Sequence, residues 1–361
     1  MNRKRLFSLS VLLMLLLPSI ATLSQNLTTQ TSTKTASLEV NNVYQDLASQ
    51  ATHIVVGEVK NIESRWNEAD GGIYSYVRIS VENFLKGSSI SNEITVKYKG
   101  GEVGGIGLLD SAEPQFWKGE KVKVFLKFLE EPNEFVVVGG RRGKISLSPN
   151  ASAGYSYDGI RWDSSDLPVK YYIDENGTSD IPGTVDEFAA VQASFQTWED
   201  DAGSYMDYTY TGTTTRKGTS QDGFNVVSWG PIDGQGGTLA ETSFWYDPVT
   251  KLLFEFDIVF DEGEPWSASG EAGKYDIQNV GAHEVGHTLV LNDLYDSADS
   301  EQTMYGYSSS GEIKKRDLHT GDIAGIRFIY GLSTITYTVD TNPTGLQIEV
   351  DGRNYTTPYS F

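Results

Sequence analysis

Two histidines and a glutamate lie within one five-residue segment, as His283, Glu284 and His287. Because the histidines are four residues apart, both imidazoles would project from one face of a helix and could bind one metal ion. Glu284 lies beside them and could reach a water molecule on that ion. Zinc polarises a scissile carbonyl and lowers the pKa of its water toward about 7, while a glutamate can carry the proton to the leaving amine. The segment therefore indicates hydrolysis of peptide bonds.

Chance explains this segment poorly. With 4 histidines in 361 residues, a random His-Glu-x-x-His is expected in roughly three chains per thousand. Ala282, Val285 and Leu289 form an apolar stripe on a different face of the same predicted helix. The helix can therefore pack by that stripe while both histidines face a cleft.

A catalytic zinc ion usually has three protein ligands, and the segment provides two. Asp293, six residues after His287, is the best candidate for the third, because a turn directly after the helix can return its carboxylate to the ion. The other histidines are His53 and His319, and the other carboxylates that remain open are Asp296, Glu301 and Glu312.

The stretch from His283 to Asp293, followed by Thr303 to Tyr307, resembles the metzincin zinc peptidases and, within them, the matrixins. The family pattern is H-E-x-x-H-x-x-G-x-x-H or -D, and a methionine closes a tight turn beneath the metal, a position that Met304 fits. Further stretches occur in matrixin order around Trp162 and Trp198 and over residues 234–240, 260–266 and 322–331. The resemblance covers about residues 155–331.

This resemblance implies an α+β fold with a twisted mixed sheet, three helices and a zinc cleft between two subdomains. It implies a zinc-dependent endopeptidase in which His283, His287 and Asp293 hold the metal and Glu284 acts as general base and acid.

The resemblance also implies how a substrate would bind. The strand around residues 238–244 would pair with a polypeptide in extended conformation, so that main-chain hydrogen bonds give affinity with little demand on sequence. Leu239 and Ala240 would contact this substrate, and Tyr305 and Tyr307 would line the pocket just past the scissile bond. Simple packing is the alternative role for the tyrosines.

Three features depart from the family pattern. The glycine seven residues after the first histidine is Val290 here, and a β-branched residue resists the positive φ that glycine permits, so the turn toward Asp293 could shift. The histidines of the family's structural zinc correspond to Glu241 and Val259, so we expect no second zinc. The chain has no cysteine, so the family's inhibitory propeptide cysteine has no counterpart.

Two acidic residues match positions that bind calcium in matrixins. They are Asp261 and Glu264, and carboxylate oxygens suit that ion. An exposed acidic surface is the alternative.

The elements around the site follow from hydrophobic spacing. Residues 38–148 show short β-type runs separated by glycine or asparagine, which predicts a small all-β domain, either a barrel or a sandwich. This domain could be a prodomain that inhibits the peptidase, and Asp110, which follows the glycine-rich loop 100–107, could cap the metal; a solvated loop is the alternative. In the region that resembles the matrixins, residues 155–331, helices are predicted over residues 185–200, from Asp276 onward and over residues 320–330.

The two ends of the chain suggest export. Basic residues 3–5, an apolar run over 6–17 and small residues after it predict a signal peptide at 1–24, with an uncleaved anchor as the alternative. Residues 25–37 form a Ser/Thr-rich linker. Residues 334–361 are too few to bury a core alone, so they are expected to be a docked hairpin or, as we favour, the start of a truncated domain, and they resemble the start of a PEGA-type surface domain. We therefore expect a secreted, extracellular or cell-surface protein.

The net charge of the chain restricts which macromolecules it could bind. The formal net charge is −21 and the mature chain has no basic cluster, which argues against nucleic acid or an anionic membrane. The oligomeric state stays open. The main rival interpretation is a non-catalytic cell-surface binding protein that uses the peptidase fold as a scaffold, but a scaffold has no need of Glu284 beside two histidines.

Overall fold

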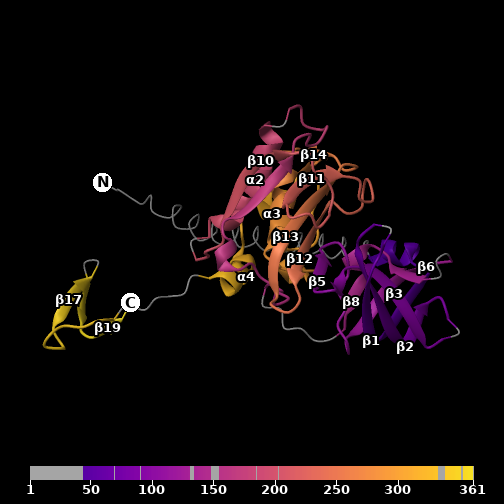
Figure 1. Ribbon diagram of the computed structural model, residues 1–361, viewed down its shortest axis with the longest axis horizontal. Coiled ribbons are helices and arrows are strands. Elements are labelled where there is room, and N and C mark those ends of the chain that lie inside the picture. Colours follow the sequence, from indigo (N-terminus) through magenta and orange to yellow (C-terminus); the bar gives the residue numbers. More distant parts are fainter. Residues whose placement is uncertain are drawn as a thin grey trace, which may run out of the picture.

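The computed structural model describes residues 44–68, 70–89, 91–130, 134–147, 154–183, 185–201, 203–331, 338–350 and 353–360. The predicted signal peptide and linker lie outside these residues. Figure 1 shows an N-terminal β part, a larger part with helices beside a sheet, and a small C-terminal β segment.

The N-terminal part is a β-barrel. Its strands are β1 (His53–Trp66), β2 (Ile73–Lys86), β3 (Glu93–Lys99), β6 (Lys121–Leu129), β7 (Glu134–Val137) and β8 (Lys144–Ser146), in the order β1-β2-β3-β7-β6-β8. Because β1 also pairs with β6, the sheet closes on itself. Val55, Val59 and Val77 are fully buried inside it.

Of the two predicted architectures for residues 38–148, the structure has the barrel. The prediction of a purely β domain missed a helical segment at residues 44–50, whose Leu47 packs against Phe125. A 3-10 turn, η1 (Gly140–Gly143), lies between β7 and β8.

A hairpin leaves this barrel and joins the other domain. It consists of β4 (Gly101–Val103) and β5 (Ile106–Asp110), which pair through Val103 and Ile106. Gly104 and Gly105 connect them with φ values of 62° and 83°, the left-handed conformation of a tight two-residue hairpin turn. The expectation of a loop over residues 100–107 was therefore wrong, because these glycines form a hairpin turn.

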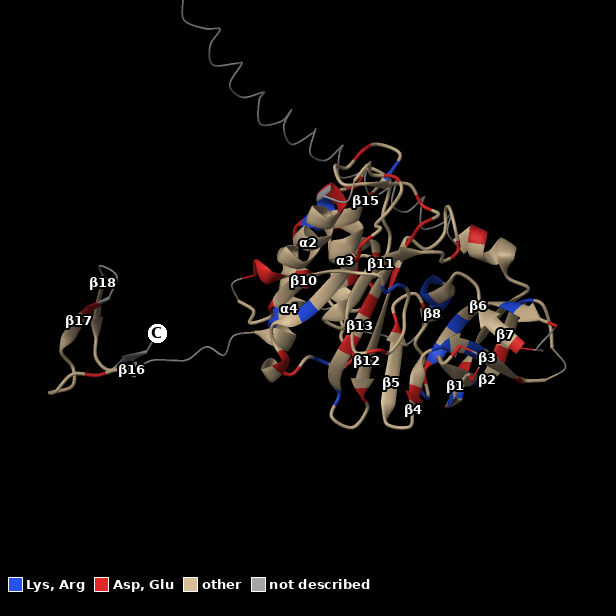
Figure 2. Ribbon diagram, turned by 45° about the horizontal axis from the view of Figure 1, so that its top comes forward, with Lys and Arg blue, Asp and Glu red and all other residues tan. Residues whose placement is uncertain are grey.

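The larger domain contains a mixed sheet. Its strands are β9 (Val169–Asp174), β10 (Tyr208–Thr214), β11 (Val226–Gly230), β12 (Ala240–Asp247) and β13 (Leu252–Asp261). The order β10-β9-β11-β13-β12-β5-β4 includes the hairpin, and β12 is antiparallel to both neighbours, β13 and β5. Figure 2 shows β5 and β4 continuing the sheet beyond β12.

Three α-helices accompany this sheet, as the sequence predicted: α2 (Val185–Glu199), α3 (Ile277–Thr288) and α4 (Thr320–Tyr330). The indole of Trp198 on α2 donates a hydrogen bond to the Ala282 carbonyl at 2.7 Å, which ties α2 to α3. Smaller elements are β14 (Trp266–Ser267), β15 (Tyr275–Asp276), η2 (Ser164–Asp166), η3 (Ser297–Asp299) and η4 (Lys314–Arg316).

Local capping sets both ends of α3. Asp276 is the N-cap, and its carboxylate accepts the Asn279 amide at 2.9 Å. At the other end, the Val290 amide bonds to the His287 carbonyl and the Leu291 amide to the Gly286 carbonyl, the two bonds of a Schellman motif. Val290 holds the left-handed position of this motif with φ 63°. Its side chain is 1% exposed, so core packing offsets the strain that a β-branched residue incurs there.

The C-terminal segment forms two small hairpins. β16 (Thr338–Val339) pairs with β19 (Tyr359–Ser360), and β17 (Gln347–Val350) pairs with β18 (Arg353–Thr356). The likeness to a PEGA-type domain stays a prediction. Among the described residues, no helix combines the length and the apolar character needed to cross a bilayer.

Candidate metal centre

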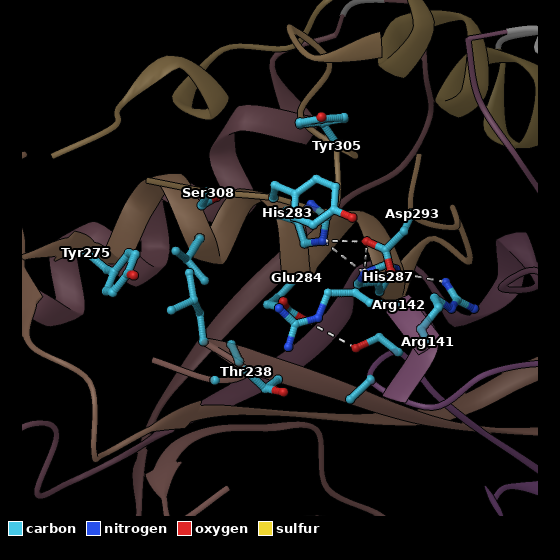
Figure 3. A pocket seen from close by; sticks show the side chains of 18 of the residues that line it. Arg141, Arg142, Thr238, Tyr275, His283, Glu284, His287, Asp293, Tyr305 and Ser308 are labelled. Atoms are coloured by element: carbon cyan, nitrogen blue, oxygen red, sulfur yellow. Dashed lines mark hydrogen bonds and ion pairs between the residues drawn. The ribbon is translucent and has the colours of Figure 1, made fainter. Parts of the chain in front are cut away.

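Three ligand atoms meet at the end of α3. Nε2 of His283 lies 3.2 Å from Nε2 of His287 and 2.9 Å from Oδ1 of Asp293, and the same oxygen lies 3.5 Å from Nε2 of His287. Figure 3 shows the three side chains converging. Ligands held about 2.0–2.1 Å from a tetrahedral zinc ion lie roughly 3.3 Å from one another. The donor set and its spacing therefore fit zinc.

Backbone carbonyls orient both histidines. Nδ1 of His283 lies 2.8 Å from the Thr303 carbonyl oxygen, and Nδ1 of His287 lies 2.7 Å from that of Leu291. A carbonyl oxygen can only accept, so Nδ1 carries the hydrogen and Nε2 presents its lone pair to the metal position.

Asp293 reaches this position because the Schellman motif turns the chain back. Burial would raise the pKa of its carboxyl, but the neighbouring imidazoles hold that pKa well below its ordinary value. The turn after α3, which Val290 could have shifted, therefore still brings an ionised carboxylate next to both histidines.

Glu284 is held by strand β12. Its side chain is buried, and Oε2 accepts a hydrogen bond from Oγ1 of Thr242 on β12 at 2.7 Å. Oγ of Ser111, which follows β5, also donates to Oε2, at 3.5 Å. Both hydrogen bonds are made to Oε2, so neither of them uses Oε1.

Met304 lies in a buried turn next to α3. A Cβ atom added to Gly286 would lie 2.1 Å from its sulfur, so only glycine at that helix position lets the turn approach this closely. The Asp322 carboxylate at the start of α4 accepts the amides of Thr303 and Met304 at 2.7 and 3.1 Å. Helix α4 thereby fixes the turn that also carries the carbonyl partner of His283.

A cleft of about 330 Å³ opens onto the candidate metal position. The predicted substrate residues Leu239, Ala240, Tyr305 and Tyr307 all line it. The barrel domain also contributes to the lining, through Ser111, Ala112, Gly139, Arg141 and Arg142.

The barrel domain contacts the site at two points. Strand β5 pairs with β12 from Gly107↔Tyr246 to Asp110↔Ser243, and the Ser111 amide extends this pairing to the Thr242 carbonyl at 2.8 Å. Arg141 lies 3.4 Å from Oδ2 of Asp293 and donates to Oδ1 of Asn292 at 3.1 Å. Figure 3 shows Arg141 and Arg142 in the same pocket as the two histidines.

The suggestion that Asp110 caps the metal was wrong. Its Oδ2 accepts hydrogen bonds from Lys99 at 2.8 Å and from Ser243 at 3.1 Å. Successive residues of a strand point to opposite faces, so Ser111, and not Asp110, reaches Glu284.

The other candidate ligands have different environments. His53 stacks edge-on against Phe135 in the barrel domain, with ring centroids 5.0 Å apart. His319 is the N-cap of α4, Asp296 is the N-cap of η3, and Lys314 lies 3.6 and 3.8 Å from Glu301 and Glu312.

Asp261 and Glu264 are buried, so the alternative of an exposed acidic surface was wrong. Oδ2 of Asp261 accepts the amides of Asp233 and Gly234 at 3.2 and 2.7 Å, and Glu264 accepts the Gly236 amide. These carboxylates hold the loop that leads into β12. Calcium binding there stays a prediction.

Thr242, Ser111 and Arg141 were missed by the sequence interpretation. Thr242 could have been found, because alternation along β12 places it on the same face as Ala240. No local pattern marks Ser111 or Arg141, since they belong to a different domain.

A mixed sheet and three helices, one of which carries the HExxH segment and is followed by a buried methionine turn, form the class of fold expected of metzincin zinc peptidases. Residues 161–331 match the model of the Matrixin family, Peptidase_M10. The resemblance to matrixins is thereby confirmed for this part of the chain.

Individual relatives share this region. Matrix metalloproteinase-18 of Xenopus laevis is 30% identical over 176 residues, which cover 48% of this chain and 34% of that protein. The interstitial collagenase of Equus caballus is 31% identical over 179 residues, covering 48% and 33%. The hatching enzyme of Paracentrotus lividus is 30% identical over 186 residues, covering 50% and 28%. The chain thus spans about a third of the length of the curated relatives it matches.

Replacing Asp293, the predicted third ligand, should abolish tight zinc binding. We expect Asp293→Ala to weaken zinc affinity by at least about 100-fold, because two imidazoles alone leave the coordination shell incomplete. Zinc content after dialysis against a weak chelator, measured by emission spectroscopy, tests this. Asp296→Ala, which removes the exposed cap of η3, is the control and should retain wild-type zinc. Equal zinc content in both variants would contradict the assignment of Asp293.

Proposed function

We propose that this protein is a zinc-dependent endopeptidase. The observation that carries the proposal is the convergence of His283, His287 and Asp293 at zinc-ligand spacing, with the Glu284 carboxylate in the same cleft. The two histidines and the aspartate would hold the ion. When bound, zinc would supply a Lewis acid that polarises the scissile carbonyl and acidifies a water molecule.

The protein's own groups account for the proton transfers. Oε1 of Glu284 takes the proton from the attacking water and returns it to the leaving amine. Thr242 fixes the carboxylate through Oε2, so this hydrogen bond does not compete for Oε1. Since Thr242 belongs to β12, the strand that would bind the substrate also orients the base.

A polypeptide substrate would lie in extended conformation along β12. Leu239 precedes this strand and Ala240 begins it, and both line the cleft, so the substrate could add to the sheet by main-chain hydrogen bonds. Tyr305 and Tyr307 would then border the side chain just past the scissile bond.

We also propose that the barrel domain inhibits the peptidase in the full chain. Strand β5 already occupies the edge of β12 over Ser243–Tyr246, where a substrate strand would pair. Ser111 binds the base, and Arg141 binds the third metal ligand. This domain would therefore act as a prodomain without a cysteine, by filling the substrate groove.

Inhibition by the barrel domain should weaken as the pH rises. Burial, with the Asp110 charge adding to it, raises the pKa of Glu241 to about 8 and that of Glu113 to about 7. Both start from an ordinary value of 4.5, so the docked state holds protons that a separated state would release above that pH. Docking therefore becomes less favourable between about pH 5 and pH 8 and levels off above pH 8.

The measurement is the ratio of wild-type activity to that of a chain whose domains are separated by Gly107→Leu. This ratio cancels the pH dependence of catalysis itself, and we expect it to rise toward one between pH 5 and pH 8. A ratio that falls over this range would contradict the proposed coupling.

Export to the cell exterior, through the predicted signal peptide, and retention at a cell surface are further parts of the proposal. Calcium at Asp261 and Glu264 would stabilise the loop before β12. The alternative, a non-catalytic binding protein, predicts no chelator-sensitive hydrolysis of casein. Zinc content together with casein hydrolysis by Gly107→Leu, with and without a chelator, separates the two functions.

A further inference from the structure

Three cations follow one another in η4, and only the middle one lacks a countercharge. Lys314 and Arg316 are partly exposed, and each has a carboxylate partner, Glu301 at 3.6 Å and Asp276 at 2.6 Å. Lys315 is 2% exposed, and no carboxylate oxygen of the described residues lies within 4.0 Å of its Nζ. It is also the only Lys or Arg of the described residues that is buried.

This lysine borders the candidate substrate cleft. It lines the same cleft as His283 and the wall from Tyr305 to Ser309. Its backbone amide donates to Oδ1 of Asn279 on α3 at 2.8 Å, and its Nζ donates to the Tyr305 carbonyl. Lys315 is thus fixed between α3 and the wall that would border the residue past the scissile bond.

A buried ammonium group without a countercharge is energetically unfavourable. Burial lowers the pKa of Lys315 to about 8, so at neutral pH the group is still mostly charged. Among the carboxylates, Glu312 has the largest electrostatic effect on the pKa of Lys315. It already has other partners, because its carboxylate accepts a hydrogen bond from the Asn279 side chain at 3.4 Å and lies 3.8 Å from Nζ of Lys314. An ammonium group has three N–H donors, and the Tyr305 carbonyl accounts for one.

We propose that Lys315 is a specificity-determining residue that selects substrates with a carboxylate side chain on the residue just past the scissile bond. This inference rests on the proposed peptidase function and names its substrate class. A glutamate side chain in this pocket would supply the missing countercharge and accept the free N–H donors. A leucine would leave the ammonium unpaired, and a lysine would repel it.

Binding of product-side tripeptides tests this without requiring turnover. The zinc-loaded full chain is titrated by calorimetry with Glu-Ala-Gly and with Gln-Ala-Gly, which differ only in the charge of the first side chain. The same titrations are run on Gly107→Leu, in which the clash with Tyr246 should weaken the pairing of β5 with β12. We expect the glutamate peptide to bind about tenfold more tightly, as is typical of a charge-assisted contact.

Two variants separate selection from a purely structural role. Lys315→Met keeps the length of the side chain and removes its charge, so it should bind both peptides equally. Lys314→Met removes the neighbouring, carboxylate-paired lysine and should keep the tenfold preference. Circular dichroism and zinc content show whether each variant is folded.

Equal affinity of the two peptides for the wild-type and Gly107→Leu chains would overturn the inference, as would a preference that survives in Lys315→Met. Failure of both chains to bind the glutamate peptide would overturn it too. A chain that prefers glutamate but hydrolyses no casein would instead contradict the proposed peptidase function alone.

Discussion

Glu284→Gln is expected to lower kcat/KM for casein by about a thousandfold while leaving zinc binding intact. Glutamine has the size of glutamate but cannot take a proton from water, and general acid–base catalysis contributes about 10²–10⁴-fold to enzymatic rates. The change also preserves a carbonyl oxygen that can accept the hydrogen bond from Thr242. Both chains should carry Gly107→Leu as well, so that the barrel domain does not mask activity.

The matched comparison is with Asp293→Ala, which should lose both zinc and activity. The two variants therefore separate loss of the base from loss of the metal, with zinc content as the second readout. Casein hydrolysis by the Glu284→Gln chain at the level of its parent would refute the mechanism.

Gly107→Leu is expected to raise the casein hydrolysis of the full chain by about tenfold. Gly107 on β5 packs so closely that a Cβ atom there would lie 2.2 Å from the ring of Tyr246 on β12. Gly107 has no positive φ, so the substitution acts through this clash and not through backbone strain. Overpacking of this kind costs about 1–3 kcal/mol, and 1.4 kcal/mol corresponds to tenfold in an equilibrium.

Gly105→Asn is the control for this prediction. Gly105 lies in the turn of the same hairpin, where an added Cβ would meet no atom within 4 Å, and asparagine tolerates its positive φ. This variant should leave casein hydrolysis unchanged. Equal activity of Gly107→Leu and wild type, with the barrel still folded, would show that β5 does not inhibit.

The convergence of the three proposed metal ligands could be predicted because these residues are local in sequence. His283 and His287 share a face of α3 by helical spacing, and the Schellman motif brings Asp293 back within a few residues. Asp276 was predicted as the N-cap of the same helix, and the structure confirms it. Hydrogen bonds between near neighbours fix such geometry, whatever the rest of the chain does.

At Val290 the structure departs from the rule that β-branched residues avoid positive φ. A β-branched residue resists positive φ, yet Val290 adopts φ 63° with its side chain in the main core. Burial of an apolar side chain contributes about 1.5–3 kcal/mol, which is comparable with the strain of the conformation. The sequence shows that a β-branched residue at positive φ is strained, and only the tertiary packing shows that burial of its side chain offsets this strain.

By itself, the sequence determined the helix with its HExxH segment, the nearness of Asp293 to both histidines, the order of the matrixin stretches and the β character of the first domain. The tertiary structure decided what covers the cleft and which charge is buried in it. Ser111 and Glu284 are 173 residues apart, and Arg141 and Asp293 are 152 residues apart. Contacts over such separations depend on how two folded domains pair along a sheet edge. Likewise, Lys315 differs from Lys314 only through its burial, which residue type and spacing do not reveal.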